Sequence, residues 1–151
     1  MSEPRPTVAL EVPLYLIVLI TGAWLRLHQI DRYPLSDAEA SEALAALPAA
    51  SEFEPPDLSS HSPAYTVLSR LAFSLSGAGD GAARWTPAIA GAALVLTPLI
   101  IRRQFGRGPA LLAAILLAVS PTVWTASRIA GGATLAAVGL LAGVLFLVRA
   151  R

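Results

Sequence analysis

The sequence predicts an all-α integral membrane protein in which four transmembrane helices carry a long outer loop with short interfacial helices. Two observations support this fold class. Of the 151 residues, 55% are hydrophobic and only 14% are charged, whereas an ordinary soluble domain has about 25% charged residues. The apolar residues also gather in four long segments, and a bilayer core requires about 20 residues of helix. We therefore expect residues 1–151 to form a single membrane domain.

Composition and charge exclude several other classes of protein. The chain has no cysteine, which excludes a disulfide-stabilised secreted scaffold and a cysteine-ligated zinc or iron–sulfur site. Its high apolar content excludes a disordered polar chain. The formal net charge is only +1, so there is no electrostatic reason to expect a nucleic acid as partner.

The predicted spans differ in length. The first contains a short apolar run that Glu11 and Arg26 extend, because long charged side chains can snorkel toward water. The bulky residues 24–27 do not resemble a signal-peptide cleavage site, so this span is expected to be an uncleaved anchor. The other three are uncharged throughout and long enough to cross. The spans are predicted over residues 12–27, 85–101, 108–127 and 129–148.

The charges between the spans predict the topology. Arg102, Arg103 and Arg107 crowd the short connection between the second and third spans, whereas the next connection carries only Arg128. By the positive-inside rule, the arginine-rich connection and both termini lie in the cytoplasm. Residues 28–83, which hold eight of the ten acidic residues, then form the outer loop. We expect a multi-pass protein of the bacterial inner (plasma) membrane.

Two short helices are predicted within this outer loop, because about 55 residues is too long for a structureless connection. Ser36 and Glu39 have the spacing of a capping box, and a helix-favouring run follows until Pro48. A second helix is predicted from Ser62, as cap, to Ser76.

The second of these helices is predicted to be amphipathic. Val67, Leu68, Leu71 and Leu75 share one face, and Tyr65, Ser69 and Arg70 lie off it. At about 14 residues the helix is too short to span. We therefore expect it to lie along the membrane surface with its leucine face toward lipid or protein.

A series of short motifs runs through the chain in a fixed order. Together they resemble the N-terminal part of the GT-C membrane glycosyltransferases, in particular the dolichyl-phosphate-mannose protein mannosyltransferase and aminoarabinose transferase branch. The resemblance covers nearly all of this chain, which would be a shortened family member. The motifs are Leu25-Arg26-Leu27, Asp37-Ala38-Glu39, His61-Ser62-Pro63-Ala64-Tyr65, Arg84-Trp85-Thr86-Pro87-Ala88-Ile89-Ala90-Gly91, Arg102-Arg103-Gln104-Phe105-Gly106, Ser120-Pro121 and Ser127-Arg128.

The resemblance implies catalytic roles for one or two carboxylates. Asp37 matches the aspartate that acts as general base toward the acceptor hydroxyl. The second carboxylate of the family's acidic pair is replaced by Ala38 here, so Glu39 is the candidate substitute. The alternative is structural: Asp37 is a first-turn acid favoured by the helix dipole, and Glu39 completes the capping box.

The resemblance also implies that His61, Arg84 and Arg128 bind the phosphate of a lipid-linked sugar, since guanidinium groups can hold phosphate bidentately. The alternative for His61 is a solvated loop residue. For the arginines it is interfacial anchoring beside Trp85 and Trp124. No metal site is predicted and the cofactor is unknown. Acidic outer-loop motifs bind a divalent metal in other GT-C enzymes, but nothing here indicates one.

Gly139 and Gly143 form a small-xxx-small pattern that allows close helix approach, either within this chain or with a partner. Two functions remain open. One is a GT-C-derived module without independent activity that serves as a small subunit of a larger membrane complex. The other is the N-terminal part of an active glycosyltransferase that uses a polyprenyl-phosphate sugar and is completed by further spans or another chain. Expected partners are membrane lipids, a lipid-phosphate-linked sugar and other membrane protein chains.

Overall fold

The computed structural model describes residues 6–47 and 62–149, and every regular element in these ranges is an α-helix. The all-α class predicted from the sequence is confirmed. The helices are α1 (Pro6–Leu27), α2 (Asp37–Ala46), α3 (Pro63–Ser76), α4 (Asp80–Val95), α5 (Thr97–Phe105), α6 (Arg107–Val119), α7 (Pro121–Ala126) and α8 (Ala133–Arg149).

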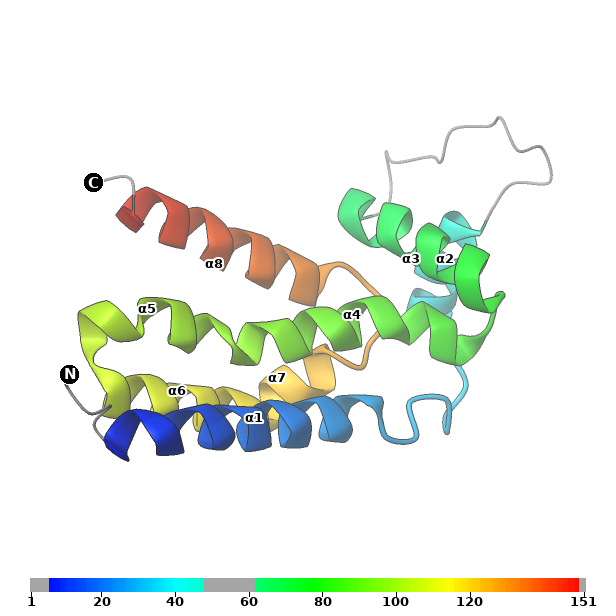
Figure 1. Ribbon diagram of the computed structural model, residues 1–151. Helices are drawn as coiled ribbons and strands as arrows, with labels where there is room; N and C mark the ends of the chain where they lie inside the picture. Colours follow the sequence, from blue (N-terminus) through cyan, green and yellow to red (C-terminus); the bar gives the residue numbers. More distant parts are fainter. Residues whose placement is uncertain (1–5, 48–61, 150–151) are drawn as a thin grey trace.

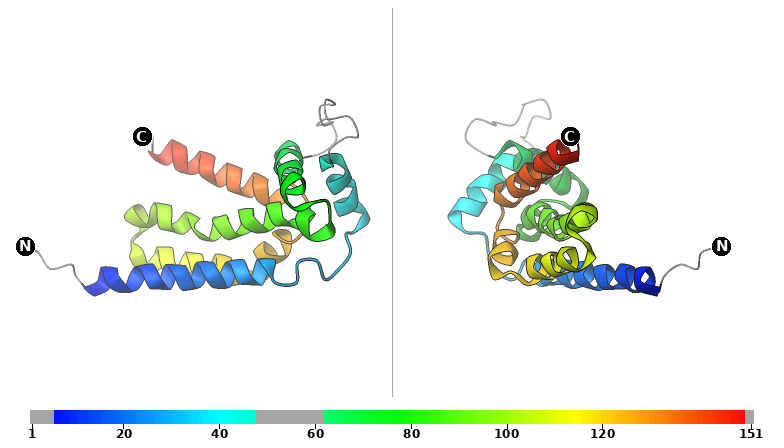
Figure 2. Two further views of the ribbon diagram at one scale, coloured as in Figure 1. Left: turned by 45° about the vertical axis from the view of Figure 1, so that its right-hand side comes forward. Right: turned by 90° about the vertical axis from the view of Figure 1, so that its left-hand side faces the viewer.

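The long helices run back and forth along one axis (Figures 1 and 2). The chain passes along α1, returns through α4 and α5, advances again through α6 and α7, and returns through α8. At one end, α2 and α3 gather beside residues 127–132. The turn between α5 and α6 lies at the opposite end, together with the start of α1 and the end of α8. The arginine-rich turn and the two outer-loop helices therefore occupy opposite ends of the bundle.

One helical run in the described ranges is long and apolar enough to cross a membrane. It is Asp80–Arg102, which has 23 residues and comprises α4 and most of α5. Three apolar helices are shorter: Val12–Leu27, Arg107–Val119 and Ala133–Leu147. The second predicted span is therefore confirmed as membrane-capable, whereas the expectation of four complete spans is not confirmed.

Two of the predicted spans are not single continuous helices. The predicted span 108–127 breaks at Ser120, where the backbone leaves the helical conformation. Pro121 follows, and because proline has no N–H and clashes with the preceding turn, it begins a new helix rather than continuing the old one. The predicted span 129–148 begins later, since residues 127–132 form turns and bends and α8 begins only at Ala133.

The helices α2 and α3 agree with their predicted bounds, and α3 packs against its neighbours with the face opposite to its leucines. Its buried face carries Tyr65, Ser69 and Phe73, which contact α2 and α4. The predicted apolar face is exposed, with Leu75 at 80% exposure, and is thus free to face lipid or another protein, as expected. Tyr65 and Ser69 are buried and find hydrogen-bond partners on α4: Ser69 Oγ donates to Thr86 Oγ1 at 3.2 Å.

Tyr65 is held by a second bond to α4. Its hydroxyl donates to the Ala83 carbonyl at 3.0 Å, and the side chain is fully buried. That carbonyl lies four residues before Pro87, which sits inside α4 and cannot donate to it. The phenol therefore satisfies a buried acceptor that the helix itself leaves open.

Arg26 corrects another expectation, because it does not snorkel to water. The side chain is completely buried. Its Nη1 donates to the carbonyls of Gly22 at 2.8 Å and Ala118 at 3.3 Å, and its Nη2 donates to Leu117 at 3.0 Å. The Leu117 carbonyl lies four residues before Pro121 and loses its helical donor for the same reason. Arg26 thus ties α1 to the broken end of α6.

Close packing of α4 against α7 keeps Arg26 in place. A Cβ atom at Gly91 would lie 3.0 Å from Arg26 Nε and would collide with the Cβ of Ser127. Only glycine allows this approach, which explains why glycine ends the motif that runs from Arg84 to Gly91.

Candidate functional site

The end of the bundle that carries α2 and α3 is organised by one carboxylate, which the capping box of α2 positions. Ser36 Oγ accepts a hydrogen bond from the Glu39 N–H at 3.4 Å, and Glu39 Oε2 accepts one from the Ser36 N–H at 3.0 Å. Both halves of the predicted capping box are therefore present. This reciprocal pair fixes where the Glu39 side chain leaves the first turn.

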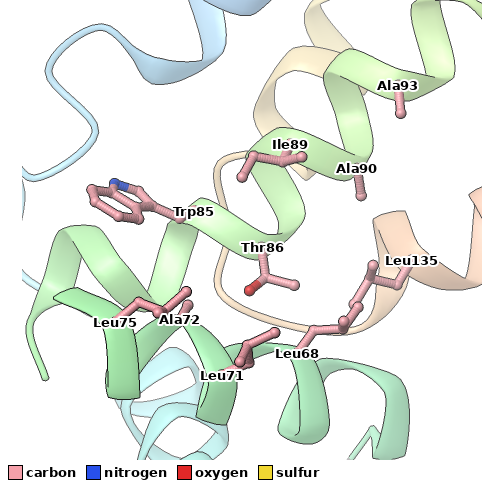
Figure 3. A pocket seen from close by; sticks show the side chains of 10 residues that line it. All are labelled: Leu68, Leu71, Ala72, Leu75, Trp85, Thr86, Ile89, Ala90, Ala93 and Leu135. Carbon is pink, nitrogen blue, oxygen red and sulfur yellow. The ribbon is translucent and has the colours of Figure 1, made fainter. Parts of the chain in front are cut away.

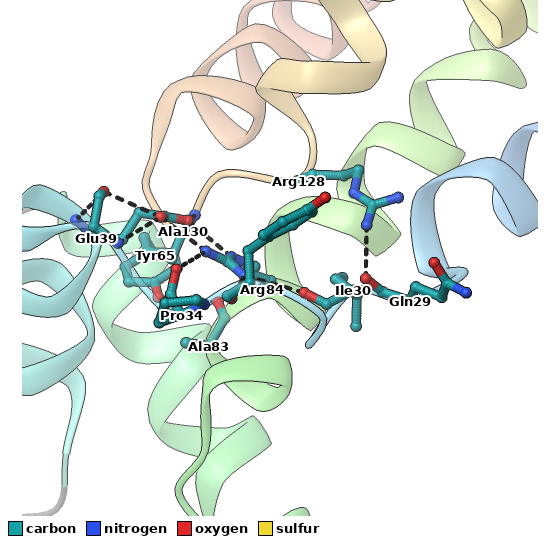
Figure 4. Close-up of polar contacts among 11 residues, drawn as sticks. Gln29, Ile30, Pro34, Glu39, Tyr65, Ala83, Arg84, Arg128 and Ala130 are labelled. Carbon is teal, nitrogen blue, oxygen red and sulfur yellow. Dashed lines mark hydrogen bonds and ion pairs between the residues drawn. The ribbon is translucent and has the colours of Figure 1, made fainter.

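Glu39 forms a buried ion pair with Arg84 of α4 (Figure 4). Arg84 Nε lies 2.9 Å from Oε1 and Nη2 lies 2.9 Å from Oε2, so the pair is bidentate. The two side chains are only 8–9% exposed. The Ala130 N–H donates to Oε1 at 2.9 Å. One carboxylate thus joins α2, α4 and the segment before α8.

Arg84 uses its remaining donors on the chain segment that follows α1. Nη1 donates to the carbonyls of Ile30 at 3.1 Å and Tyr33 at 2.7 Å, and Nη2 donates to Pro34 at 3.2 Å. With the two bonds to Glu39, all five N–H donors of the guanidinium are used. A phosphate can reach Arg84 only if some of these bonds break.

The surroundings of Glu39 keep it ionised. Burial raises the pKa of the carboxyl, but hydrogen bonds from Arg84 and from the Ser36 and Ala130 backbones outweigh it and lower the pKa from 4.5 to about 2. A general base works best with a pKa near the operating pH. In this arrangement Glu39 is therefore suited to holding the outer loop together rather than to accepting a proton. Nearby, burial raises the pKa of the Tyr65 hydroxyl.

Asp37, the predicted general base, lies apart from this cluster. It is the first residue of α2, it is exposed, and it has no hydrogen bond or ion pair within the part of the chain that the structure describes. Side chains two residues apart leave a helix on nearly opposite sides. The Asp37 side chain therefore leaves the helix on a different side from Glu39, and within the described residues no ion pair joins Asp37 to Arg84 or Arg128.

Arg128 closes the end of α1 rather than joining the Glu39 cluster. It donates to the carbonyls of Leu25 at 3.1 Å and Gln29 at 2.9 Å. Its guanidinium lies 5.2 Å from the ring centre of Trp124, whose Nε1 also donates to the Leu25 carbonyl at 2.7 Å. His61 lies outside the described residues. The three predicted phosphate-binding residues thus remain predictions, and the two described ones occupy separate places.

An apolar groove lies between α3, α4 and α8 (Figure 3). Its volume is about 400 Å³. Leu68, Leu71 and Leu75 of the exposed α3 face line one side, and Trp85 and Ile89 of α4 line another. Residues 6–47 and 62–149 contain no group of three or more His, Asp or Glu side chains that could hold a metal ion.

Two organising residues, Arg26 and Tyr65, were not assigned these roles by sequence reasoning. The sequence does indicate that a hydrogen-bond donor is needed at each of these two places. Pro87 and Pro121 each free the carbonyl four residues earlier, and a buried carbonyl needs a donor from elsewhere. What the sequence does not show is which donor lies close enough, because Tyr65 and Arg26 are 18 and 91 residues away from their acceptors.

These features define a class of protein: in residues 6–47 and 62–149 the chain is all-helical, has one membrane-capable helix, and has an ion pair that joins α2 to α4. The family model of dolichyl-phosphate-mannose-protein mannosyltransferases matches residues 60–151, which is more than half of the chain. The protein therefore belongs to this family, which is of the GT-C type and membrane-embedded. The match includes Arg84 and Arg128, whereas Asp37 and Glu39 precede it. Neither a curated protein nor a solved structure matches the chain.

Proposed function

We propose that this chain is a GT-C-derived membrane module without independent sugar transfer, which acts as a small subunit of a larger membrane complex. The observation that carries the proposal is the outward face of α8. Figures 1 and 2 show α8 diverging from α4 and α5 toward its end. A Cβ at Gly139 or Gly143 would meet nothing within 4 Å, so in the described chain these glycines pack against no other helix.

This glycine face suits another helix better than it suits lipid. Small residues at this spacing let two backbones approach closely within a membrane. Leu140 and Phe146 are each 73% exposed and flank the glycines. A partner helix on this face would therefore gain both close backbone contact and bulky side chains around it.

The charged residues of the outer end also support a structural role. Glu39 and Arg84 are bonded to each other and to backbone groups, and Asp37 is turned away from them. These groups hold α2, α4 and the segment before α8 in one arrangement, which presents the α3 and α8 faces to a neighbour.

Assembly tests the subunit role directly. We expect Gly139→Leu with Gly143→Leu to dissociate the native complex in size-exclusion chromatography after solubilisation in mild detergent. Ala137→Leu is the matched control, because Ala137 is an exposed small residue on a different side of α8. A complex that survives the double substitution, or a chain that purifies alone from its native membrane, contradicts the proposal.

The alternative is the N-terminal part of an active glycosyltransferase that other spans or another chain complete. Family membership and the apolar groove beside Trp85 favour it, because the family description names a lipid-linked sugar donor. Asp37→Asn separates the two functions, since a helix N-terminus tolerates asparagine. A loss of sugar transfer of at least about 10²-fold, the size expected for removing a general base, supports the enzyme. If the native chain shows no sugar transfer and the variant still assembles into the complex, the result supports the subunit.

The proposal includes a multi-pass topology with both termini cytoplasmic, in the inner (plasma) membrane of a bacterium. The native chain has no cysteine, so single cysteines report position cleanly. We expect Ser41→Cys on α2 to react with an impermeant maleimide from outside. Gln104→Cys, in the arginine-rich turn, should react only after permeabilisation. Both residues are exposed. Labelling of both from one side contradicts this topology.

A further inference from the structure

A second cavity lies on a different side of the bundle from the groove of Figure 3. It is formed by the end of α1, the segment after it and α7, and its volume is about 580 Å³. Trp24 and Trp124 form part of its wall, and Arg32, Arg128 and His28 bring nitrogen donors to it. The rings of Trp24 and His28 are stacked with centres 4.7 Å apart.

The cavity is cationic. Two arginines and a histidine line it, and none of its lining residues is acidic. Arg128 uses two of its five N–H donors on the carbonyls of Leu25 and Gln29, and Arg32 uses one on the side-chain oxygen of Gln29 at 2.9 Å. The other guanidinium donors have no partner within residues 6–47 and 62–149. Planar guanidinium groups with free donors match the geometry of phosphate oxygens.

An apolar stripe of α1 leads away from the cavity along the bundle. Ile17 and Ile20 precede Trp24 by seven and four residues, so the three side chains lie on one face of the helix. All three are about 60% exposed. Tryptophans beside arginines are typical of the level of lipid headgroups. A molecule with its phosphate in the cavity would therefore place an apolar tail along Ile20 and Ile17.

We propose that this cavity binds the phosphate headgroup of an anionic membrane phospholipid, with the acyl chains along the Ile17–Ile20 face of α1. Arg32 and Arg128 contact the phosphate oxygens, and the two tryptophans enclose the glycerol region. This site is independent of the subunit role. It shares no residue with the groove between α3, α4 and α8, and it does not require the Glu39–Arg84 pair to open.

Lipid titration of the full chain in a neutral detergent, followed by native mass spectrometry, tests the site. We expect saturable binding of dioleoyl phosphatidylglycerol that is tighter than binding of dioleoyl phosphatidylcholine, because the latter's headgroup has no net charge. Arg32→Gln with Arg128→Gln should weaken phosphatidylglycerol binding roughly thirtyfold, the effect of losing two arginines near an anionic headgroup.

Two further variants keep the result interpretable. Arg32→Gln alone should weaken binding about fivefold. Arg32 is exposed, hydrogen-bonds to Gln29 and lies 5.9 Å from the ring centre of its neighbour Tyr33, so its loss spares the helix contacts of Arg128. Arg70→Gln is the matched control, since Arg70 is an arginine of α3 that does not line the cavity, and it should bind as the native chain does.

Three results would overturn the proposal. The first is equal phosphatidylglycerol affinity in the native chain and the double variant. The second is equal affinity for the two phospholipids. The third is displacement of the bound lipid by inorganic phosphate at a concentration similar to that of the lipid, which would assign the cavity to free phosphate instead.

Discussion

Two buried arginines organise two regions of this protein, and their partners differ. Beside α2 and α3, Arg84 pairs with a carboxylate, and all five of its N–H donors are bonded. Between α1 and α6, Arg26 is equally enclosed, but its partners are backbone carbonyls. Its Nε is buried and has no hydrogen-bond partner among residues 6–47 and 62–149.

The difference shows two ways in which a helical membrane module can hold an arginine inside. An ion pair connects segments that have no covalent or helical continuity, because each charge is costly to bury without the other. A carbonyl-bound arginine serves a different need, since it supplies donors where a proline has removed one. We therefore expect loss of Arg84 to leave a buried charge, and loss of Arg26 to leave only unpaired carbonyls.

The largest effect is expected from Arg84→Met. It strands the Glu39 carboxylate in a buried site, and breaking one side of a buried pair costs about 3–5 kcal/mol. The free energy of unfolding, measured by titration with a denaturing detergent and followed by circular dichroism, should fall by this amount. Arg84→Met combined with Glu39→Leu should recover most of the loss. A single variant as stable as the native chain would show that the pair contributes little.

Acid should weaken the same region. The pKa of Glu39 is lowered to about 2 in the folded chain from 4.5, so its contribution to stability is fully present above about pH 4.5. That contribution is lost as the pH falls toward 2, because the unfolded chain takes up the proton first. Unfolding measured between pH 6 and pH 2 should show this step, and Glu39→Gln should remove it. Asp37→Asn is the control, because Asp37 is an exposed carboxylate on the same turn, and it should keep the step.

A smaller effect is expected from Arg26→Met. The substitution fills much of the same volume but leaves the Leu117 and Ala118 carbonyls without this donor, which costs about 1–3 kcal/mol. Pro121→Ala offers a test of the cause, because alanine restores an N–H for the Leu117 carbonyl. Combined with Arg26→Met, it should recover part of the lost stability in a double-mutant cycle. Strictly additive effects would show that the proline does not create the need for Arg26.

The smallest effect is expected from Tyr65→Phe. It removes the donor to the Ala83 carbonyl and keeps the ring packed between α3 and α4, so it should destabilise the fold by about 1 kcal/mol. Pro87→Ala provides a helical N–H to the same carbonyl, and we expect Tyr65→Phe to cost less in that background. Thermal unfolding of the four chains in detergent measures this. An equal cost in both backgrounds would show that the contribution of the Tyr65 hydroxyl does not depend on Pro87.

Local sequence predicted the outer-loop helices well, because their signals act within one turn. Ser36 and Glu39 form the predicted capping box, and Pro63 begins α3 directly after Ser62. The helix breaks within the later predicted spans were not predicted. Uncharged residues run through Ser120 and across residues 129–132, so hydropathy alone does not reveal that the helix breaks there.

The candidate site also has some features that the sequence predicted and others that it did not. The resemblance indicated that Asp37, Glu39, Arg84 and Arg128 belong to one outer region, and composition indicated that it faces away from the arginine-rich turn. Which charges meet depends on helix phase and on distant partners. Glu39 reaches Arg84 because the capping box turns it toward α4, whereas Asp37, two residues earlier, leaves the helix on the other side.

The sequence by itself determined that the chain is helical and rich in apolar segments, that its outer loop carries two short helices, and that it is related to the GT-C transferases. Capping residues act within one helical turn, and composition and motif order are properties of the sequence itself, so these features need no tertiary contacts to be recognised. Only the tertiary structure decided that polar residues of α3 face inward, that Arg26 is buried, and that Glu39 pairs with Arg84. Each of these depends on a donor and an acceptor far apart in the chain, and burial makes their hydrogen bonds obligatory only once the helices have packed.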